Sequence, residues 1–595
     1  MGKINEDNVE AKYNGNALLR LLTYAKPYAL WIALALALVL ALTWFELYRP
    51  ILVGDAINLF EANGDYDVIV DTAIKYSIIL VLGFAFNVAQ TWILQKLGQN
   101  IILQVRKELY VHIQSLSSRY FDLTPVGKLV TRVSNDVEAL DEMYSGILVK
   151  LFKNIVMIIG LAAVMLFYDY KLALLSFTLL PVVILLTVVF RRLARKIYRL
   201  YRTRLTDLNT FLSEHLSGMR IIQIFGRERR KYEEFHGKNH KLYRAFYTEM
   251  LIFAIFRPLI FILSVLSLMI ALWFGSKEVL SSVISVGTLY IFSIYIQSFF
   301  EPIQELAEQF STLQSSIASA EKIFTIMDED FSIEEIDNPV ILPEIKGRIE
   351  FDHVWFAYDD ENYVLRDVSF VIEPGQKVAF VGATGAGKSS ILNLIGRYYD
   401  IQKGHIYIDG VDIKKLSKKQ LRSAIGQMQQ DVFIFEGDVE YNIRLHDEDI
   451  TDEDVRAAAE YVNASSFIEK LPNGYKEPVT ERGATFSAGE RQLLSFARTL
   501  AHKPSILVMD EATANIDTET ELLIQEALEK LMEGRTTIMV AHRLSTNQHA
   551  DCIMVMDKGQ IAEIGTHEEL MEKNGIYRKI YDMQMTITEE GESNE

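Results

Sequence analysis

Long apolar runs with few charges dominate the first half of the chain, whereas short apolar runs alternate with polar stretches in the second half. A bilayer core of about 30 Å is crossed by about 20 apolar residues in a helix. We therefore expect six transmembrane helices, which cover residues 28–47, 76–95, 147–167, 172–190, 251–275 and 286–303. Residues 17–24 have an amphipathic pattern, which predicts a helix along the inner membrane surface.

Two long loops between these spans, residues 96–146 and 191–250, keep a helical periodicity and lack clusters of Gly and Pro. The spans are therefore expected to continue as long helices beyond the membrane. Each loop contains a break that predicts either a short crosswise helix or a plain helical turn. The breaks are marked by Phe121, Asp122, Pro125 and Gly127 in the first loop, and by Glu214, Gly218, Phe225 and Gly226 in the second.

The distribution of charge indicates the orientation in the membrane. The loop of residues 191–250 carries fifteen Lys and Arg residues, whereas the loop between the first two spans is acidic. Basic loops stay on the cytosolic side, so both termini and the soluble half are expected in the cytosol, below a cytoplasmic (inner) membrane. The net charge of −18 and the lack of a basic stripe in the soluble half argue against a nucleic-acid partner.

Two features inside the spans have more than one interpretation. Arg257 lies in the fifth span, where a charge faces water, snorkels to the interface or finds an ion-pair partner. Phe292, Tyr295 and Phe299 share one face of the sixth span at helical spacing. They either line a cavity for apolar cargo or pack against neighbouring helices and lipid, and packing is the interpretation favoured here.

The second half of the chain predicts an α/β domain with a mostly parallel sheet. Its strongest motif follows the apolar strand at residues 378–381 and matches GxxxxGK[ST], the phosphate-binding loop. The loop reads Gly382-Ala383-Thr384-Gly385-Ala386-Gly387-Lys388-Ser389, and Ser390 follows it. Its backbone N–H groups and Lys388 are expected to hold the phosphates of ATP, and Ser389 is expected to offer its hydroxyl to Mg²⁺.

A second apolar strand, at residues 505–509, ends in two acids, Asp510 and Glu511. Two carboxylates at the end of a buried strand are costly without a nearby cation. We expect Asp510 to help hold Mg²⁺ and Glu511 to polarise the water that attacks the terminal phosphate. The alternative is an ordinary solvated acidic turn.

The segment Phe486-Ser487-Ala488-Gly489-Glu490 resembles LSGGQ, the signature of the ABC transporter family. Together with the phosphate loop and the Asp-Glu strand, it makes the whole chain similar to exporter-type half-transporters. The resemblance implies that the signature of one half caps the ATP held by the other half. Ser487, Gly489 and Glu490 then belong to the nucleotide site of a partner chain.

The same resemblance assigns further residues. Tyr358 matches the aromatic residue that stacks on adenine, and Gln430 matches the glutamine that touches Mg²⁺ and senses the γ phosphate. Asp517 resembles the D-loop aspartate, and His542 matches the switch histidine that bonds the γ phosphate. Glu511 and His542 are thus the expected catalytic pair, and Ser389, Gln430 and Asp510 are the expected metal ligands.

The signature departs from LSGGQ at three positions, Phe486, Ala488 and Glu490. A methyl group at Ala488 crowds the approach to phosphate, and Glu490 brings a negative charge near a polyanion. Both changes are expected to weaken capping. A heterodimer, in which a partner with an intact signature completes the Glu511 site, is therefore favoured over a homodimer that tolerates the change.

These observations predict an α-helical six-span transmembrane domain with long cytosolic extensions, followed by an α/β P-loop nucleotide-binding domain. The expected divisions are 1–27 for an N-terminal segment, 28–303 for the membrane domain, 304–346 for a linker, 347–585 for the nucleotide-binding domain and 586–595 for an acidic tail. The expected function is ATP-driven export of apolar or amphipathic compounds by alternating access. A lipid or peptide exporter and an ATP-gated channel or regulatory subunit are the alternatives.

Overall fold

The computed structural model describes residues 15–583 apart from 65, 331–332, 334–335, 337, 360–361, 430–431, 481–482, 484, 511–517 and 541–549. The chain divides into two compact units. The helical unit comprises Met1–Gln114 and Val126–Glu329, and the sheet unit comprises Ser115–Pro125 and Asp330–Glu595. The short segment 115–125 thus interrupts the helical unit in sequence but packs with the sheet unit.

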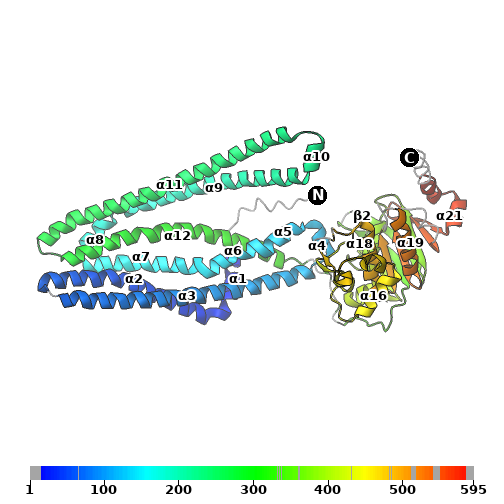
Figure 1. Ribbon diagram of the computed structural model, residues 1–595, viewed down its shortest axis with the longest axis horizontal. Coiled ribbons are helices and arrows are strands. Elements are labelled where there is room, and N and C mark those ends of the chain that lie inside the picture. The colour runs from blue at the N-terminus through cyan, green and yellow to red at the C-terminus, as the bar shows by residue number, and fades with distance from the viewer. Residues whose placement is uncertain are drawn as a thin grey trace. The chain divides into compact units, whose positions relative to one another are not determined.

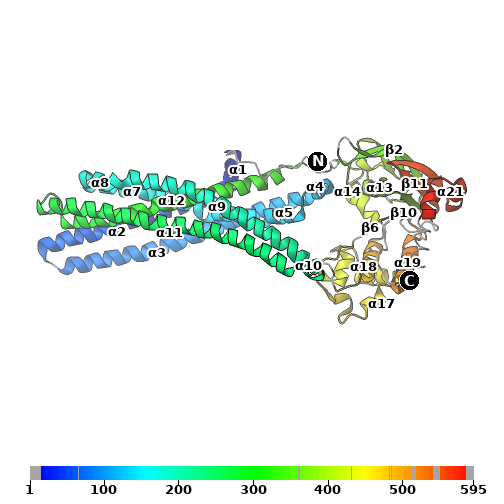
Figure 2. The same cartoon turned by 90° about the horizontal axis from the view of Figure 1, so that it is seen from above.

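The helical unit consists almost entirely of long helices that run lengthwise beside one another (Figures 1 and 2). Its helices are α1 (Gly15–Ala25), α2 (Ala29–Asn63), α3 (Tyr66–Ser115), α5 (Val126–Thr131), α6 (Val137–Glu142), α7 (Leu148–Tyr168), α8 (Tyr170–Ser176), α9 (Leu180–Ser217), α10 (Met219–Ile224), α11 (Glu228–Leu280) and α12 (Val286–Met327). Two π-helical turns, Arg132–Asp136 and Met143–Ile147, separate α5 from α6 and α6 from α7. Helix α10 joins the paired helices α9 and α11 at one end (Figure 1).

Five helical stretches in the described part of the chain are long and apolar enough to cross a membrane. They are Ala17–Ala62, Tyr66–Ser115, Val126–Tyr168, Tyr170–Ser217 and Glu228–Leu280. Each contains one of the first five predicted spans. The sixth predicted span lies in α12, where polar residues such as Gln297 and Glu301 interrupt the apolar run, and this span stays a prediction.

Local sequence signals explain where several of these helices begin and end. Asp169 accepts a hydrogen bond from the N–H of Leu172 at 2.7 Å and so caps the start of α8. Gly64 ends α2 in the left-handed conformation, which glycine adopts without a steric cost. The predicted breaks are confirmed as short helices, α4 (Ser118–Leu123) and α10, rather than plain turns.

Close packing between α2 and α12 depends on two glycines. A Cβ atom at Gly287 would lie 2.0 Å from the carbonyl oxygen of Gly54, so no larger residue fits there. Further along α12, Phe292, Tyr295 and Phe299 are at most 5% exposed. Their burial inside the helical unit supports the packing interpretation of this aromatic stripe.

Arg257 forms an ion pair with an acidic residue on another helix. Its Nη2 atom lies 3.8 Å from Oε1 of Glu308 on α12, and both side chains are more than half exposed. Of the alternatives for Arg257, the structure therefore shows a loose interhelical ion pair.

The predicted linker, residues 304–346, is wrong in its first half because α12 continues without a break to Met327. Ile317, Ala320, Ile323 and Phe324 recur at helical spacing and are buried, which explains why the helix persists. The boundary between the two units falls after Glu329.

Helix α1 holds this distal end of α12. Its Arg20 lies 2.5 Å from Oδ1 of Asp328 and 4.4 Å from the ring centroid of Phe324. Tyr24 stacks on the same phenylalanine ring, and its hydroxyl donates a hydrogen bond to Glu108 on α3 at 2.7 Å. The amphipathic helix predicted for residues 17–24 is thus present and is anchored to α12 and α3 by its polar side chains.

The sheet unit contains the predicted mostly parallel sheet, in the order β12-β11-β3-β10-β9-β6. A second, antiparallel sheet has the order β2-β1-β4-β5. The strands are β1 (Ile349–Ala357), β2 (Tyr363–Ile372), β3 (Lys377–Gly382), β4 (Lys403–Ile408), β5 (Val411–Asp412), β6 (Ile425–Met428), β7 (Gly437–Asp438), β8 (Pro478–Val479), β9 (Ile506–Asp510), β10 (Thr536–Val540), β11 (Cys552–Asp557) and β12 (Gln560–Gly565). The central strands β3, β9 and β10 are almost fully buried, as their apolar runs predict.

Some helices of the sheet unit pack on its sheets, and others form a separate lobe. They are α13 (Lys388–Ile395), α14 (Lys418–Ser423), α15 (Val439–Arg444), α16 (Asp452–Tyr461), α17 (Ser465–Ile468), α18 (Ala488–Ala501), α19 (Thr518–Met532) and α21 (His567–Lys573). In Figure 2, α17 and α18 lie to one side of this unit, and β2 and β11 lie to the other. Helix α4 belongs to this unit by its contacts.

Candidate functional site

The phosphate-binding loop has the predicted strand-loop-helix context, between β3 and α13. Gly385 and Gly387 have φ angles of +83° and +103°, which favour glycine. A Cβ atom at Gly387 would lie 2.7 Å from Leu365 Cδ2, and one at Gly382 would lie 2.3 Å from the carbonyl oxygen of Met556. The loop therefore has the tightly wound backbone that a phosphate cradle needs.

Lys388 opens α13, and its side chain is only 6% exposed. Its ammonium group donates hydrogen bonds to the carbonyl oxygens of Gly382 and Ala383 at 2.7 and 3.1 Å. The positive charge is thus held inside the curve of the loop. Ser389 beside it is exposed, whereas Ser390 is buried and lies 3.1 Å from the hydroxyl oxygen of Tyr358.

The strand register brings Asp510 to the edge of the sheet where the loop lies. Asp510 is paired with Val540 on β10, and Val540 is paired with Phe380 on β3, two residues before Gly382. All three strands are parallel, so their carboxyl ends meet at the same edge. The hydroxyl of Ser389 and the carboxylate of Asp510 are oxygen donors of the kind that Mg²⁺ prefers.

The signature segment begins helix α18, with Ser487 as its N-cap. Ser487 Oγ accepts a hydrogen bond from the N–H of Glu490 at 3.2 Å, and the carboxylate of Glu490 accepts one from the N–H of Ser487 at 2.8 Å. This reciprocal pair is a capping box. The negative charge of Glu490 therefore already occupies the positive end of the helix, where a phosphate of a partner's nucleotide is expected.

The other two departures from LSGGQ have different surroundings. Phe486 is 5% exposed and packs against Phe467, so this residue acts as part of the apolar core. Ala488 is exposed at the first position of α18, and Gly489 is buried. Only Ala488 and Glu490 therefore present an altered surface.

Tyr358 lies beside the phosphate loop, as predicted for an adenine platform. Its hydroxyl accepts a hydrogen bond from Asn393 at 3.4 Å in addition to its contact with Ser390. The sequence interpretation missed Tyr399, whose ring meets that of Tyr358 edge to face at 5.0 Å. The only sequence signal was the apolar and aromatic character of the segment after α13.

Several predicted site residues lie outside the described residues. These are Gln430, Glu511, Asp517 and His542. Their roles stay predictions. The described strands β6, β9 and β10 are parallel neighbours in the sheet, and they end at Met428, Asp510 and Val540.

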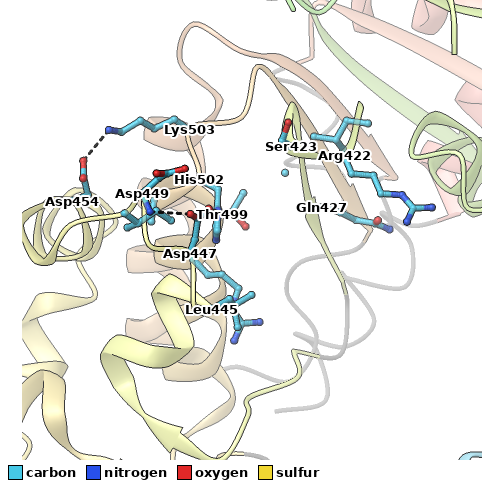
Figure 3. A pocket seen from close by; sticks show the side chains of 15 residues that line it. Arg422, Ser423, Gln427, Leu445, Asp447, Asp449, Asp454, Thr499, His502 and Lys503 are labelled. Atoms are coloured by element: carbon cyan, nitrogen blue, oxygen red, sulfur yellow. Dashed lines mark hydrogen bonds and ion pairs between the residues drawn. The ribbon is translucent and has the colours of Figure 1, made fainter. Parts of the chain in front are cut away.

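A separate cleft of about 390 Å³ lies elsewhere in the sheet unit, between α14 and β6 on one side and α15, α16 and α18 on the other. Figure 3 shows His502 and Thr499 on one wall and Ser423 and Gln427 on the opposite wall. Burial lowers the pKa of His502 below its ordinary value, although Asp447 lies 3.5 Å away and opposes this effect. None of the residues of the phosphate loop lines this cleft.

The family assignment rests on comparisons with known proteins. The profile of the ABC transporter transmembrane region matches residues 32–303, and the ABC transporter profile matches residues 365–514. An ABC transporter ATP-binding protein of Streptococcus pneumoniae, exp8, is 39% identical over 95% of this chain and 97% of its own length. The chain belongs to the ABC transporter family. It is an exporter-type half-transporter that hydrolyses ATP, with a multi-pass membrane domain.

Other relatives carry names that mention cargo. The multidrug resistance ABC transporter ATP-binding/permease protein YheH of Bacillus subtilis is 40% identical, over 86% of this chain and 76% of its own length. An ATP-dependent lipid A-core flippase of Syntrophus aciditrophicus is 33% identical over 98% of this chain and 97% of its own length. The solved structure of a bacterial Atm1-family ABC exporter with ATP bound has a TM-score of 0.76 and 25% identity, over 96% and 99% of the two chains.

Proposed function

We propose that this half-transporter exports apolar or amphipathic compounds across the cytoplasmic membrane by alternating access, as one half of a heterodimer. The observation that supports ATP as the energy source is the buried Lys388 inside a glycine-wound loop. ATP binding would bring two nucleotide-binding domains together, and hydrolysis would release them. The conformational change would then turn a cavity between the membrane helices outward.

The residues of this chain have distinct tasks in that cycle. Backbone N–H groups of the loop from Gly382 to Gly387 bind the phosphates, and Lys388 balances their charge. Ser389, Gln430 and Asp510 would hold Mg²⁺, which when bound neutralises charge that develops on the phosphate oxygens. Glu511 orients the attacking water, and His542 bonds the γ phosphate.

The exposed surface of α10 supports a second half-transporter as partner. Ile221, Ile224 and Phe225 are between 63% and 71% exposed, as is Leu216 just before them. Exposed apolar side chains clustered on a short loop helix mark an interaction site. A nucleotide-binding domain of the partner chain is the occupant that fits a pair of half-transporters.

The altered signature supports a heterodimer. Because Glu490 already caps α18 with its own carboxylate, a partner's γ phosphate would meet a negative charge instead of free donors. Two such sites in a homodimer would both be weakened. A partner with an intact signature would instead complete the Glu511 site of this chain, which leaves one strong and one weak site.

The names of two relatives bear on the cargo. YheH is named for multidrug resistance and the Syntrophus protein for lipid A-core transport, so a lipid or peptide exporter is the alternative within the same mechanism. An ATP-gated channel is the alternative from another class.

The deciding experiment is Glu511→Gln in sealed vesicles with a fluorescent amphipathic dye. A pump should lose ATP hydrolysis and uphill dye transport together, by about 100-fold or more, while MgATP binding persists. Lys388→Ala is the companion variant and should lose binding as well. A wild-type complex that binds MgATP without hydrolysing it would refute the pump. A Glu511→Gln complex that still passes ions would refute it as well.

A further inference from the structure

One short helix from the membrane domain's sequence, α4, packs with the nucleotide-binding unit of its own chain. The contact includes a hydrogen bond from the hydroxyl of Tyr399 to the carboxylate of Asp122 on α4. Tyr399 is only 9% exposed. Burial and the neighbouring Asp122 both raise the pKa of Tyr399, so the phenol keeps its proton and stays a donor at every physiological pH.

The ring of Tyr399 also contacts the expected adenine platform. It meets Tyr358 edge to face with ring centroids 5.0 Å apart, at an interplanar angle of 89°. Phe356 completes the cluster, with centroids 4.7 Å from Tyr358 and 5.7 Å from Tyr399. Three rings in mutual edge-to-face contact leave each one little freedom to tilt independently.

The other end of this cluster reaches the phosphate loop helix. The hydroxyl of Tyr358 lies 3.1 Å from Ser390 Oγ and accepts a hydrogen bond from Asn393, both on α13. A continuous set of contacts therefore runs from Asp122 on α4 through Tyr399 and Tyr358 to α13. A base that stacks on Tyr358 would restrict the motion of the Tyr358 ring. That ring contacts Tyr399, whose hydroxyl bonds Asp122 on α4.

We propose that Tyr399 is a positioning residue that links the adenine platform at Tyr358 to helix α4, so that binding of the nucleotide base stabilises α4 on the nucleotide-binding domain. This inference rests on the proposed role of Tyr358. The proposed coupling differs from closure driven by the phosphates. It depends on the nucleotide base, and it connects two parts of the same chain. By reciprocity, loosening α4 must weaken binding of the base by the same factor.

The test is hydrogen–deuterium exchange of the full-length transporter in lipid nanodiscs, read in peptides that cover residues 115–125. One probe is the non-hydrolysable nucleotide AMP-PNP with Mg²⁺. The other is magnesium tripolyphosphate, which has the phosphates and lacks the base. The nucleotide should slow exchange of this segment about fivefold, a modest coupling between two sites, and tripolyphosphate should not.

Two matched substitutions isolate the link. Tyr399→Phe keeps the ring but removes the hydroxyl that bonds Asp122, and should abolish the slowing by AMP-PNP. Tyr398→Phe makes the same change one residue earlier, where the ring instead faces the guanidinium of Arg422 at 4.7 Å, and should behave as wild type. Slowing that survives in Tyr399→Phe, or that tripolyphosphate reproduces, would overturn the proposal.

Reciprocity gives an independent readout that a purely structural role would not move. Asp122→Ala should weaken the affinity for AMP-PNP about fivefold and leave the affinity for tripolyphosphate unchanged. Equal affinities for AMP-PNP in wild type and Asp122→Ala would also overturn the proposed link between Tyr358 and α4. ATP hydrolysis by the wild-type preparation tests the pump separately, because a chain that fails to hydrolyse ATP would still report the exchange result.

Discussion

Replacing Glu490 with Gln separates two roles of one carboxylate. The side chain caps α18 through the N–H of Ser487 at 2.8 Å, and it places a negative charge where a partner's γ phosphate is expected. Gln keeps an acceptor oxygen but removes the charge. The substitution should therefore weaken the helix cap slightly and improve the capping of ATP.

The stability loss follows from the helix terminus. A charge in the first turn contributes about 0.3 to 1 kcal/mol through the helix dipole, and a charged acceptor makes a stronger hydrogen bond than a neutral one. We expect Glu490→Gln to cost about 0.5 to 1 kcal/mol. In a domain of this size, that loss lowers the Tm by about 1 to 3 °C.

The gain at the ATP site follows from Coulomb repulsion. Two like charges about 4 Å apart repel by about 1 kcal/mol in water and by about 4 kcal/mol at an effective dielectric of 20. Because Glu490 is half-buried, a relief of about 1 to 2 kcal/mol is expected. This corresponds to an apparent ATP affinity about 5- to 30-fold tighter at the site that this signature faces.

A second capping box in the same domain supplies the control. Thr566 caps α21, and the carboxylate of Glu569 accepts its N–H at 3.1 Å. Glu569→Gln should lower the Tm by a similar amount and leave ATP binding unchanged. The assays are thermal unfolding and a titration of ATP binding to both sites of the purified complex. If Glu490→Gln changes the Tm but not the ATP affinity of the site that this signature faces, the charge of Glu490 does not oppose ATP capping.

Three further predictions concern stability. Arg20→Gln should cost less than about 1 kcal/mol in thermal unfolding, because Arg20 and Asp328 are 37% and 61% exposed and water screens their ion pair. Phe496→Ala should cost about 3 to 5 kcal/mol, because the ring is fully buried in the core of the sheet unit; calorimetry measures this loss. Since burial lowers the pKa of His502, the unfolded chain binds more protons near pH 6.5, and stability should rise with pH through that range. His502→Gln should flatten this rise in melting experiments from pH 5 to 8.

Each of these three has a result that would contradict its reasoning. A loss above about 2 kcal/mol in Arg20→Gln would mean that the ion pair is shielded from water. A loss below about 1 kcal/mol in Phe496→Ala would mean that the core collapses around the missing ring. An unchanged pH slope in His502→Gln would place the titrating group elsewhere.

Local patterns predicted most of the fold. The glycine spacing from Gly382 to Gly387 requires a wound backbone between a strand and a helix, and the structure has it. The error at the predicted linker arose because charged residues after Ile303 were given more weight than a buried stripe that includes Ile317 and Phe324. That stripe has the helical period, so the signal was present in the sequence.

The capping box at Ser487 and Glu490 could have been predicted from the sequence, but the resemblance to LSGGQ drew attention away from it. The spacing of a serine three residues before a glutamate is itself a helix-start signal. Measured against LSGGQ, however, Glu490 was interpreted only as an altered signature. The structure shows the helix cap, and the same carboxylate is expected to oppose ATP capping, so one side chain would stabilise the helix and weaken the site.

The contact between Tyr399 and Asp122 could not be predicted, because 277 residues separate them. Neither side chain belongs to a motif, and which aromatic ring α4 meets depends on how residues 115–125 pack within the sheet unit. Motifs report where the chain holds phosphate, since that chemistry needs fixed residue types at fixed spacing. The route by which a bound base affects α4 requires only that packed side chains touch, so it becomes visible only in the folded chain.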